Sequence, residues 1–128
     1  GMLTVLIRIL VALPTVLFFY QGVNWLFQPE EAAAGLGMSL LSGIGASTQI
    51  GDLGSFFLVN SGLMALGQFR GRSQLLYIPA AFIGAAGIFR TLSAVMGNAD
   101  FAAQMIGFEA ILTVILVVAA RHLANDEK

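Results

Sequence analysis

The sequence predicts an all-α fold: a single four-helix transmembrane bundle over residues 1–128, with a short surface helix in its first loop. Three observations lead to this prediction. Hydrophobic residues make up 58% of the 128 residues and charged residues only 10%, whereas about 25% charged residues is ordinary for a soluble domain. The mean hydropathy is +0.88. The apolar residues also fall into four long runs that turn-forming and charged segments separate.

The first apolar run covers residues 3–27, which exceeds the roughly 20 residues that a helix needs to cross a bilayer. Pro14 is expected to bend this helix, and Arg8 is expected to snorkel to the interface. Tyr20, Trp25 and Phe27 resemble an aromatic belt at the other interface. A signal peptide is the alternative, but the length of the run and the absence of a preceding basic cluster favour a retained span.

A connection over residues 28–50 follows the first span. Proline and two acids open it, which suits the first turn of a helix. We therefore expect a short helix that lies on the surface or is tucked under the bundle. Glycines then interrupt the remaining connection, at Gly35, Gly37, Gly43 and Gly45.

Three further spans are predicted over residues 51–69, 74–96 and 101–123. The tight basic turn at residues 70–73 makes the second and third spans an antiparallel hairpin, and a second turn lies at residues 97–100. In the third span, small residues recur at intervals of four, three and four, so they share one helical face. Such a face lets transmembrane helices approach closely, and it comprises Ala80, Gly84, Gly87 and Thr91.

Orientation follows from the distribution of charge. Four antiparallel spans place the cations Arg8, Arg70, Arg72, Arg121 and Lys128 on one side. The acids Glu30, Glu31, Asp52 and Asp100 lie on the other side. Because cytoplasmic loops carry an excess of Lys and Arg, both termini are predicted to be cytoplasmic.

The candidate site is a polar cluster within the apolar hairpin of the third and fourth spans. Arg90 and Glu109 lie at nearly equal distances from the turn, so two helices would bring them within roughly 3 Å in height. Three roles are open: a structural ion pair, a proton relay, or an anchor for a polar head group. Asp52 either joins Arg90 or caps the second span. Asn60, with Ser61, is expected to form hydrogen bonds between helices.

Other chemistries find little support in the sequence. The chain has no cysteine, which excludes thiolate metal sites and a Cys nucleophile. His122 is the single histidine; a lone imidazole is no metal site, and no histidine is placed to activate a serine. The net charge of −1 gives no reason to expect nucleic-acid binding. We therefore expect no cofactor, no metal and no catalytic residue, and an enzyme is the less favoured reading.

A resemblance to a known group rests on three stretches of the chain. These are residues 25–29, Gly51-Asp52 leading to Phe56-Phe57 and Gly62, and residues 80–90 followed by Gly97. The pattern is similar to small bacterial four-helix membrane proteins classed as a domain of unknown function, near the DoxX-like family. The resemblance implies a four-span protein of the bacterial inner membrane and brings no established site with it. Some DoxX-like proteins are associated with membrane redox complexes, but no redox signature here matches them.

Two functions are therefore carried forward. In the first, the protein is a structural or accessory subunit whose buried Arg-Glu pair locks the bundle while its surface binds a membrane partner. In the second, it is an oligomeric binder or permeation unit for a small amphipathic or anionic molecule, with Arg90 as counter-ion. A membrane redox subunit is a third option, implied by the resemblance alone. The partners expected are membrane lipid, a second copy of the chain, or another membrane protein.

Overall fold

The computed structural model describes all 128 residues, and every regular element in it is helical. Five α-helices and one 3₁₀ turn follow one another along the chain. They are α1 (Met2–Phe27), α2 (Pro29–Gly35), α3 (Gly43–Leu66), η1 (Ser73–Leu76), α4 (Tyr77–Val95) and α5 (Ala103–Asp126). The all-α prediction is confirmed, and the short helix expected after the first span is α2, with Pro29 in its first turn.

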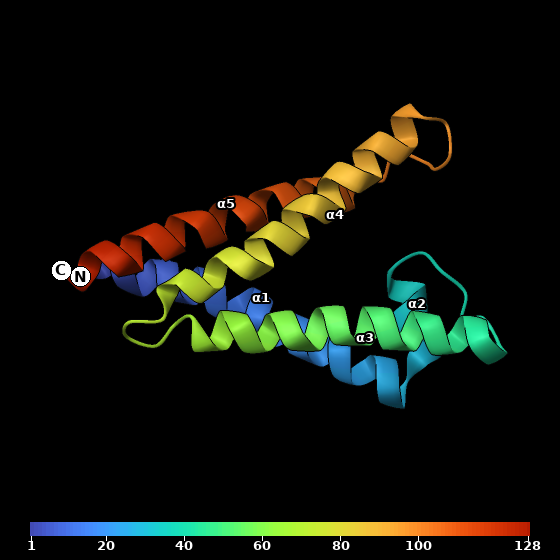
Figure 1. Cartoon of the computed structure of the whole chain (residues 1–128), viewed down its shortest axis with the longest axis horizontal. Helices are drawn as coiled ribbons and strands as arrows, with labels where there is room; N and C mark the ends of the chain where they lie inside the picture. Colours follow the sequence, from blue (N-terminus) through green and yellow to red (C-terminus); the bar gives the residue numbers. More distant parts are fainter.

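The long helices form two pairs. Helix α1 packs against α3, and α4 packs against α5. Figure 1 shows the pairs lying together at the end that holds both termini and spreading apart toward the opposite end. The loops after α2 and α4 therefore lie at the open end, whereas the turn between α3 and α4 lies beside the termini. This divergence positions the candidate site described below.

Close approach at a glycine holds the first pair together. A Cβ atom on Gly22 of α1 would lie 2.9 Å from the backbone nitrogen of Leu58 on α3, so no larger residue fits without a backbone shift. One turn along α1, Trp25 packs over Gly54, where an added Cβ would lie 3.3 Å from the Trp25 Cβ. The two backbones are in contact because these positions have no side chain.

The second pair uses the small-residue face predicted from the sequence. A Cβ atom on Gly84 would lie 3.4 Å from Thr113 Cγ2, and one on Gly87 would lie 3.5 Å from Glu109 Cβ. Both contacts run from α4 to α5. The predicted packing role of this face is confirmed, and it brings the Glu109 backbone close to the turn of α4 that precedes Arg90.

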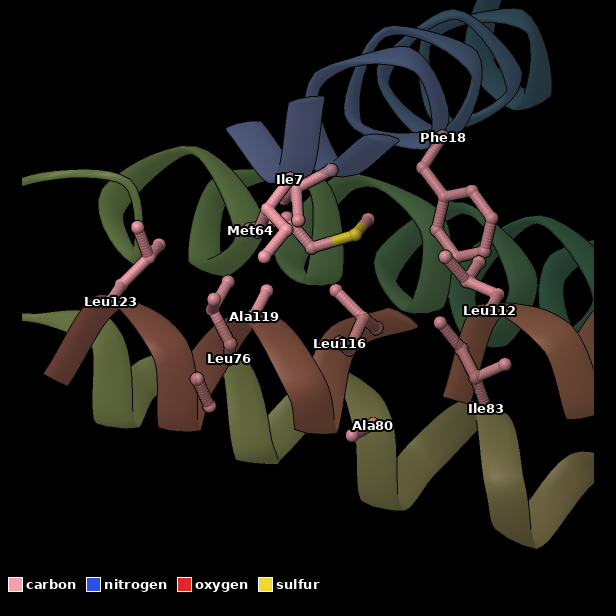
Figure 2. Packing of buried hydrophobic residues seen from close by; sticks show 12 residues of the cluster. Ile7, Phe18, Met64, Leu76, Ala80, Ile83, Leu112, Leu116, Ala119 and Leu123 are labelled. Carbon is pink, nitrogen blue, oxygen red and sulfur yellow. The ribbon is translucent and has the colours of Figure 1, made fainter. Parts of the chain in front are cut away.

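The main core lies where the two pairs meet, away from the open end. Figure 2 shows Ile7 and Phe18 of α1 and Met64 of α3 facing residues of η1, α4 and α5. The cluster joins one pair to the other through twelve buried side chains. They are Ile7, Val11, Phe18, Met64, Leu76, Ala80, Ile83, Leu112, Leu116, Ala119, Ala120 and Leu123.

A second, smaller hydrophobic core encloses Trp25, and it overturns the expectation that Trp25 lies at the membrane interface. Trp25 is fully buried and packs with Ala32 and Ala33 of α2, so the prediction that it belongs to an interfacial aromatic belt is wrong. The reason is that α2 folds back over the end of α1 and covers the indole. Tyr20 and Phe27, the other members of the predicted belt, are 60% and 76% exposed.

Length and composition support three of the four predicted spans. Three helical segments are long and apolar enough to cross a membrane: Met2–Phe27, Ser73–Val95 and Ala103–Asp126. Helix α3 is not among them because glycines, Asp52, Asn60 and hydroxyl residues lower its hydropathy. It also starts at Gly43, eight residues before the predicted span, so Gly45 lies within the helix and does not interrupt it. A four-span bundle is therefore not established by length and composition.

Hydrogen bonds tie together the segments at the closed end of the molecule, which is the end that holds both termini. Arg8 Nη1 donates to the backbone oxygen and to Oε1 of Gln68, and Gln68 Nε2 donates to the Arg8 carbonyl at 3.0 Å. The Gly71 amide donates to Glu127 Oε1 at 2.8 Å. The start of α1, the turn after α3 and the end of α5 are thus held as one unit.

Candidate functional site

Arg90 and Glu109 form the one ion pair in the structure. Arg90 lies in the last two turns of α4 and Glu109 in the second turn of α5, so they face each other beside the loop that joins the two helices. The Arg90 Nε atom lies 3.1 Å from Glu109 Oε1 and 3.2 Å from Oε2. The predicted proximity of these two residues is confirmed.

The pair uses only part of its hydrogen-bonding capacity. One N–H group, on Arg90 Nε, makes the whole contact: it donates a hydrogen bond to Oε2 and lies in ion-pair contact with the buried Oε1, which accepts no hydrogen bond. A guanidinium carries five N–H donors, yet neither Nη1 nor Nη2 of Arg90 bonds to any group of the chain. The side chain of Arg90 is 35% exposed and that of Glu109 is 13% exposed. The terminal nitrogens of Arg90 are therefore available to a further acceptor.

A cleft of about 510 Å³ lies between the two helix pairs, and Arg90 and Glu109 form part of its wall. This volume falls within the roughly 300–1,000 Å³ of small-molecule sites. All five α-helices contribute residues to the lining of the cleft. Its lining is Phe18, Gly35, Leu36, Leu53, Phe56, Phe57, Ile83, Ala86, Arg90, Gln104, Met105, Phe108 and Glu109.

Aromatic rings form the inner part of this lining. The ring centroids of Phe18 and Phe57 are 4.9 Å apart at 72°, and those of Phe56 and Phe57 are 5.0 Å apart at 89°. Edge-to-face contacts of this kind hold the rings in fixed positions. The cleft thus combines a rigid apolar interior with two charged groups and one amide, Gln104, on the α4–α5 side.

A second, smaller cavity of about 300 Å³ also includes Glu109. Its walls come only from α4 and α5, and they include Gly84, Gly87 and Thr91 of the small-residue face. Arg90 does not line this groove. Glu109 therefore stands between the central cleft and the α4–α5 groove, whereas Arg90 faces the cleft alone.

The structure leaves Asp52 outside the predicted cluster. Its side chain is exposed, and it forms no ion pair with Arg90. The alternative, that Asp52 caps the second span, is also wrong, because α3 begins nine residues earlier and Asp52 lies in its third turn. The early start of α3 explains the second error, because Asp52 lies inside the helix and not at its end.

Asn60 is likewise not part of the cluster. It is buried at 2% exposure, and its Nδ2 donates to the Phe56 carbonyl of its own helix at 2.8 Å. Ser61 donates to the Leu58 carbonyl, also within α3, at 2.7 Å. The predicted interhelical hydrogen bonds are therefore wrong, because both side chains donate within α3, as polar residues inside helices often do, and Asn60 Oδ1 is buried without a partner.

The remaining polar residues of interest lie far from the cleft, at the closed end. Arg8 bonds to Gln68, and the Thr4 hydroxyl lies 2.9 Å from His122 Nε2. The Thr4 hydroxyl also lies 3.3 Å from Asp126 Oδ2, to which it can donate. No group of three or more His, Cys, Asp or Glu side chains lies close enough together to hold a metal ion.

Sequence reasoning missed most of the cleft. Gln104, Phe18 and Phe108 were not singled out, and Phe56 and Phe57 entered only through the resemblance, although one local signal existed. Ile83, Ala86 and Arg90 follow intervals of three and four, so they share a face of α4, and all three line the cleft. The aromatic lining had no local signal, because it depends on how far the two helix pairs diverge.

The arrangement offers one clear chemical capacity: a cation with two free nitrogen atoms at the edge of an apolar cleft. Such a site can receive an anionic oxygen group together with an attached apolar chain.

Comparison with known proteins adds no constraint. No protein-family model, no curated protein and no solved structure matches this chain.

Proposed function

We propose that this protein is an integral membrane protein that binds an amphiphile with an anionic head group in the cleft between its two helix pairs. The head group, a carboxylate or a phosphate, bonds to Nη1 and Nη2 of Arg90. The apolar chain lies against the phenylalanines of α1 and α3. The single observation that carries the proposal is that Arg90 borders a cleft of about 510 Å³ with both terminal nitrogens unbonded.

The membrane assignment rests on three apolar helices and on the packing of the fourth. At 1.5 Å per residue α1 is about 39 Å long and α3 about 36 Å. Since α3 runs back along α1, we place it across the same membrane, as a fourth span whose polar face is turned toward protein. The cations Arg70 and Arg72 at the closed end favour a cytoplasmic location for both termini, in the inner membrane of a bacterium.

The chemistry of the cleft supports an anionic amphiphile over a neutral one. An ionised side chain within a bilayer is costly unless it is paired, and Arg90 is only half paired with Glu109. A phosphate or carboxylate matches the planar fork of a guanidinium with two parallel hydrogen bonds. A purely apolar ligand would leave those nitrogen atoms without an acceptor.

The test measures binding of laurate and of dodecyl phosphate to the full chain in phosphatidylcholine nanodiscs. Replacing Arg90→Gln is expected to weaken binding about 10- to 100-fold, because hydrogen bonds to a charged group contribute about 1.5–3 kcal/mol. The matched control is Arg70→Gln, an exposed arginine at the closed end, which is expected to leave binding unchanged. Dodecanol, which has the same chain without the charge, is expected to bind weakly to all three proteins.

Equal affinity of the parent chain and Arg90→Gln for both probes would refute the proposal. The two probes also separate the sources of the ligand. Tighter binding of dodecyl phosphate indicates a phospholipid-type head group, and tighter binding of laurate indicates a fatty acid.

A second candidate is the structural or accessory subunit suggested by the sequence. The observation that favours it is that the Arg90–Glu109 pair joins α4 to α5 where the two helices leave the core. In that role the pair fixes how α4 packs against α5 and has no ligand. Unfolding of the bundle in Glu109→Gln, with no detectable binding of either probe to the parent chain, would favour this candidate.

A further inference from the structure

We infer that the cleft is closed at its inner end and selects its ligand by chain length, with room beyond Arg90 for an extended chain of about eight carbons. The residues that set this length are Ile83, at the floor of the cleft, and Ala86, about halfway between the floor and Arg90. The inference rests on the proposed function, and it deepens that function by naming the class of ligand: alkyl anions of medium chain length.

The floor of the cleft is formed by residues that also belong to the main core. Ile83 of α4 and Phe18 of α1 line the cleft, yet they are only 1% and 4% exposed and belong to the cluster of buried side chains that joins the two helix pairs. Figure 2 shows their side chains beside that of Leu112 on α5. The cleft therefore ends where the core begins.

The lining stops at the core on the other long helices too. On α5 the last lining residue toward the termini is Glu109, and Leu112, on the next turn, is 2% exposed. On α3 the last lining residue is Phe57. Asn60 and Met64 follow it on the same face and are 2% and 0% exposed. A chain that enters from the open end thus meets packed side chains on every long helix.

The depth of the cleft follows from α4, which runs from the closed end to the open end. Ile83, Ala86 and Arg90 share the face of α4 that lines the cleft. Seven residues separate Ile83 from Arg90, which corresponds to about 10 Å at 1.5 Å per residue. An extended alkyl chain advances about 1.3 Å per carbon, because its bonds of about 1.5 Å zigzag. About eight carbons therefore fill the distance from Arg90 to the floor.

Chains of other lengths fit this space less well. A shorter chain leaves an unfilled space at the floor, and a void the size of a methyl group is unfavourable in a packed interior. A longer chain either overfills the floor, which a packed core resists, or bends out of the cleft toward lipid. The edge-to-face contact of Phe18 with Phe57 holds this end of the cleft in a fixed shape.

The experiment measures binding of n-alkyl phosphates to the full-length protein in phosphatidylcholine nanodiscs, with chains of about 6 to about 14 carbons. Each dissociation constant is expressed as a mole fraction of the probe in the bilayer. Partition of the probe from water into lipid would otherwise raise the apparent affinity about fourfold per methylene group. On this scale we expect octyl phosphate to bind most tightly, and hexyl and dodecyl phosphate to bind at least about fivefold more weakly.

The variant Ala86→Leu places a larger side chain in the path of the ligand. It is expected to weaken binding of octyl phosphate about tenfold and to affect hexyl phosphate less, because the shorter chain reaches less far past position 86. The matched control is Ala85→Leu, the same replacement at the neighbouring position, which is exposed and does not line the cleft. The control should keep the chain-length profile of the parent protein.

The variant Ile83→Ala removes three carbon atoms from the floor. The chain length that binds most tightly is expected to increase to about 10 carbons. An unchanged optimum in the folded variant would show that Ile83 is not the floor. The profile of the parent protein and the pair of replacements at positions 85 and 86 need no change in the core, so poor folding of Ile83→Ala does not block the test.

Failure of this inference can be told apart from failure of the proposed function. Binding that needs Arg90 but does not depend on chain length, or that still strengthens beyond about 10 carbons, overturns the selection by length and leaves the amphiphile site standing. Equal effects of Ala85→Leu and Ala86→Leu overturn it as well. No binding of any alkyl phosphate or of laurate overturns both.

Discussion

The guanidinium of Arg90 meets the carboxylate of Glu109 through a single N–H group, with Nε 3.1 Å from Oε1. A structural Arg–carboxylate pair commonly engages two parallel N–H groups. The contact lies at the seam between α4 and α5, where a Cβ atom on Gly87, one turn before Arg90, would lie 3.5 Å from Glu109 Cβ. The terminal nitrogens of Arg90, a residue that lines the cleft, are left without a partner in the chain.

Glycine at position 22 is predicted to be essential for the contact between α1 and α3. Gly22→Ala places a methyl group 2.9 Å from the Leu58 nitrogen, and we expect it to lower the free energy of unfolding by about 1–3 kcal/mol, as overpacking does. The measurement is unfolding of the purified chain in mixed micelles. Gly62→Ala in α3 is the control, since an added Cβ there meets nothing within 4 Å. Equal stability of the two variants would contradict the observed packing.

The buried position of Trp25 predicts its fluorescence. Because it is the only tryptophan and is fully buried under α2, its emission should be blue-shifted and weakly quenched by acrylamide or by brominated lipid. A Tyr20→Trp replacement in a Trp25→Phe background moves the indole to a position that is 60% exposed in the structure. Brominated lipid should quench that variant strongly. Strong quenching of the parent chain by brominated lipid would instead indicate that Trp25 lies at the membrane interface, as the sequence predicted.

We expect the loss of the hydrogen bonds between the side chains of Arg8 and Gln68 to lower the stability of the protein. Gln68→Ala removes the amide that bonds to Arg8 in both directions, and we expect a loss of about 1–3 kcal/mol because a half-buried charged donor loses an acceptor. Thermal unfolding in detergent measures the effect. Gln74→Ala, at an exposed position of η1, should change stability by less than about 0.5 kcal/mol. A similar small effect at Gln68 would show that the pair is not stabilising.

The absence of cysteine makes the topology directly measurable. Single replacements Ser39→Cys, before α3, and Arg72→Cys, after it, lie at opposite ends of that helix. If α3 crosses the membrane with both termini inside, a membrane-impermeant maleimide added to intact cells labels Ser39→Cys only, and Arg72→Cys reacts after lysis. Labelling of both sites in intact cells would place α3 outside the bilayer.

Hydropathy and turn residues alone were enough to predict the all-α class, three of the long apolar helices, the short helix at Pro29 and the small-residue face of α4. These features are local, since each depends on residues within one or two turns. The partnership of Arg90 and Glu109 was also predictable, because a short turn fixes how two neighbouring helices align. By contrast, the starting point of α3 was misjudged, since the glycines expected to interrupt a helix, Gly43 and Gly45, lie within its first turn.

Only the tertiary structure decided what surrounds the ion pair. The burial of Trp25 and the cleft lined by Phe18 and Phe57 both depend on contacts between different helices. The physical reason is that the angle between the two helix pairs is set by packing in the shared core, around Met64 and Leu116. That angle leaves the end near Arg90 open, and no pattern within a single helix encodes it.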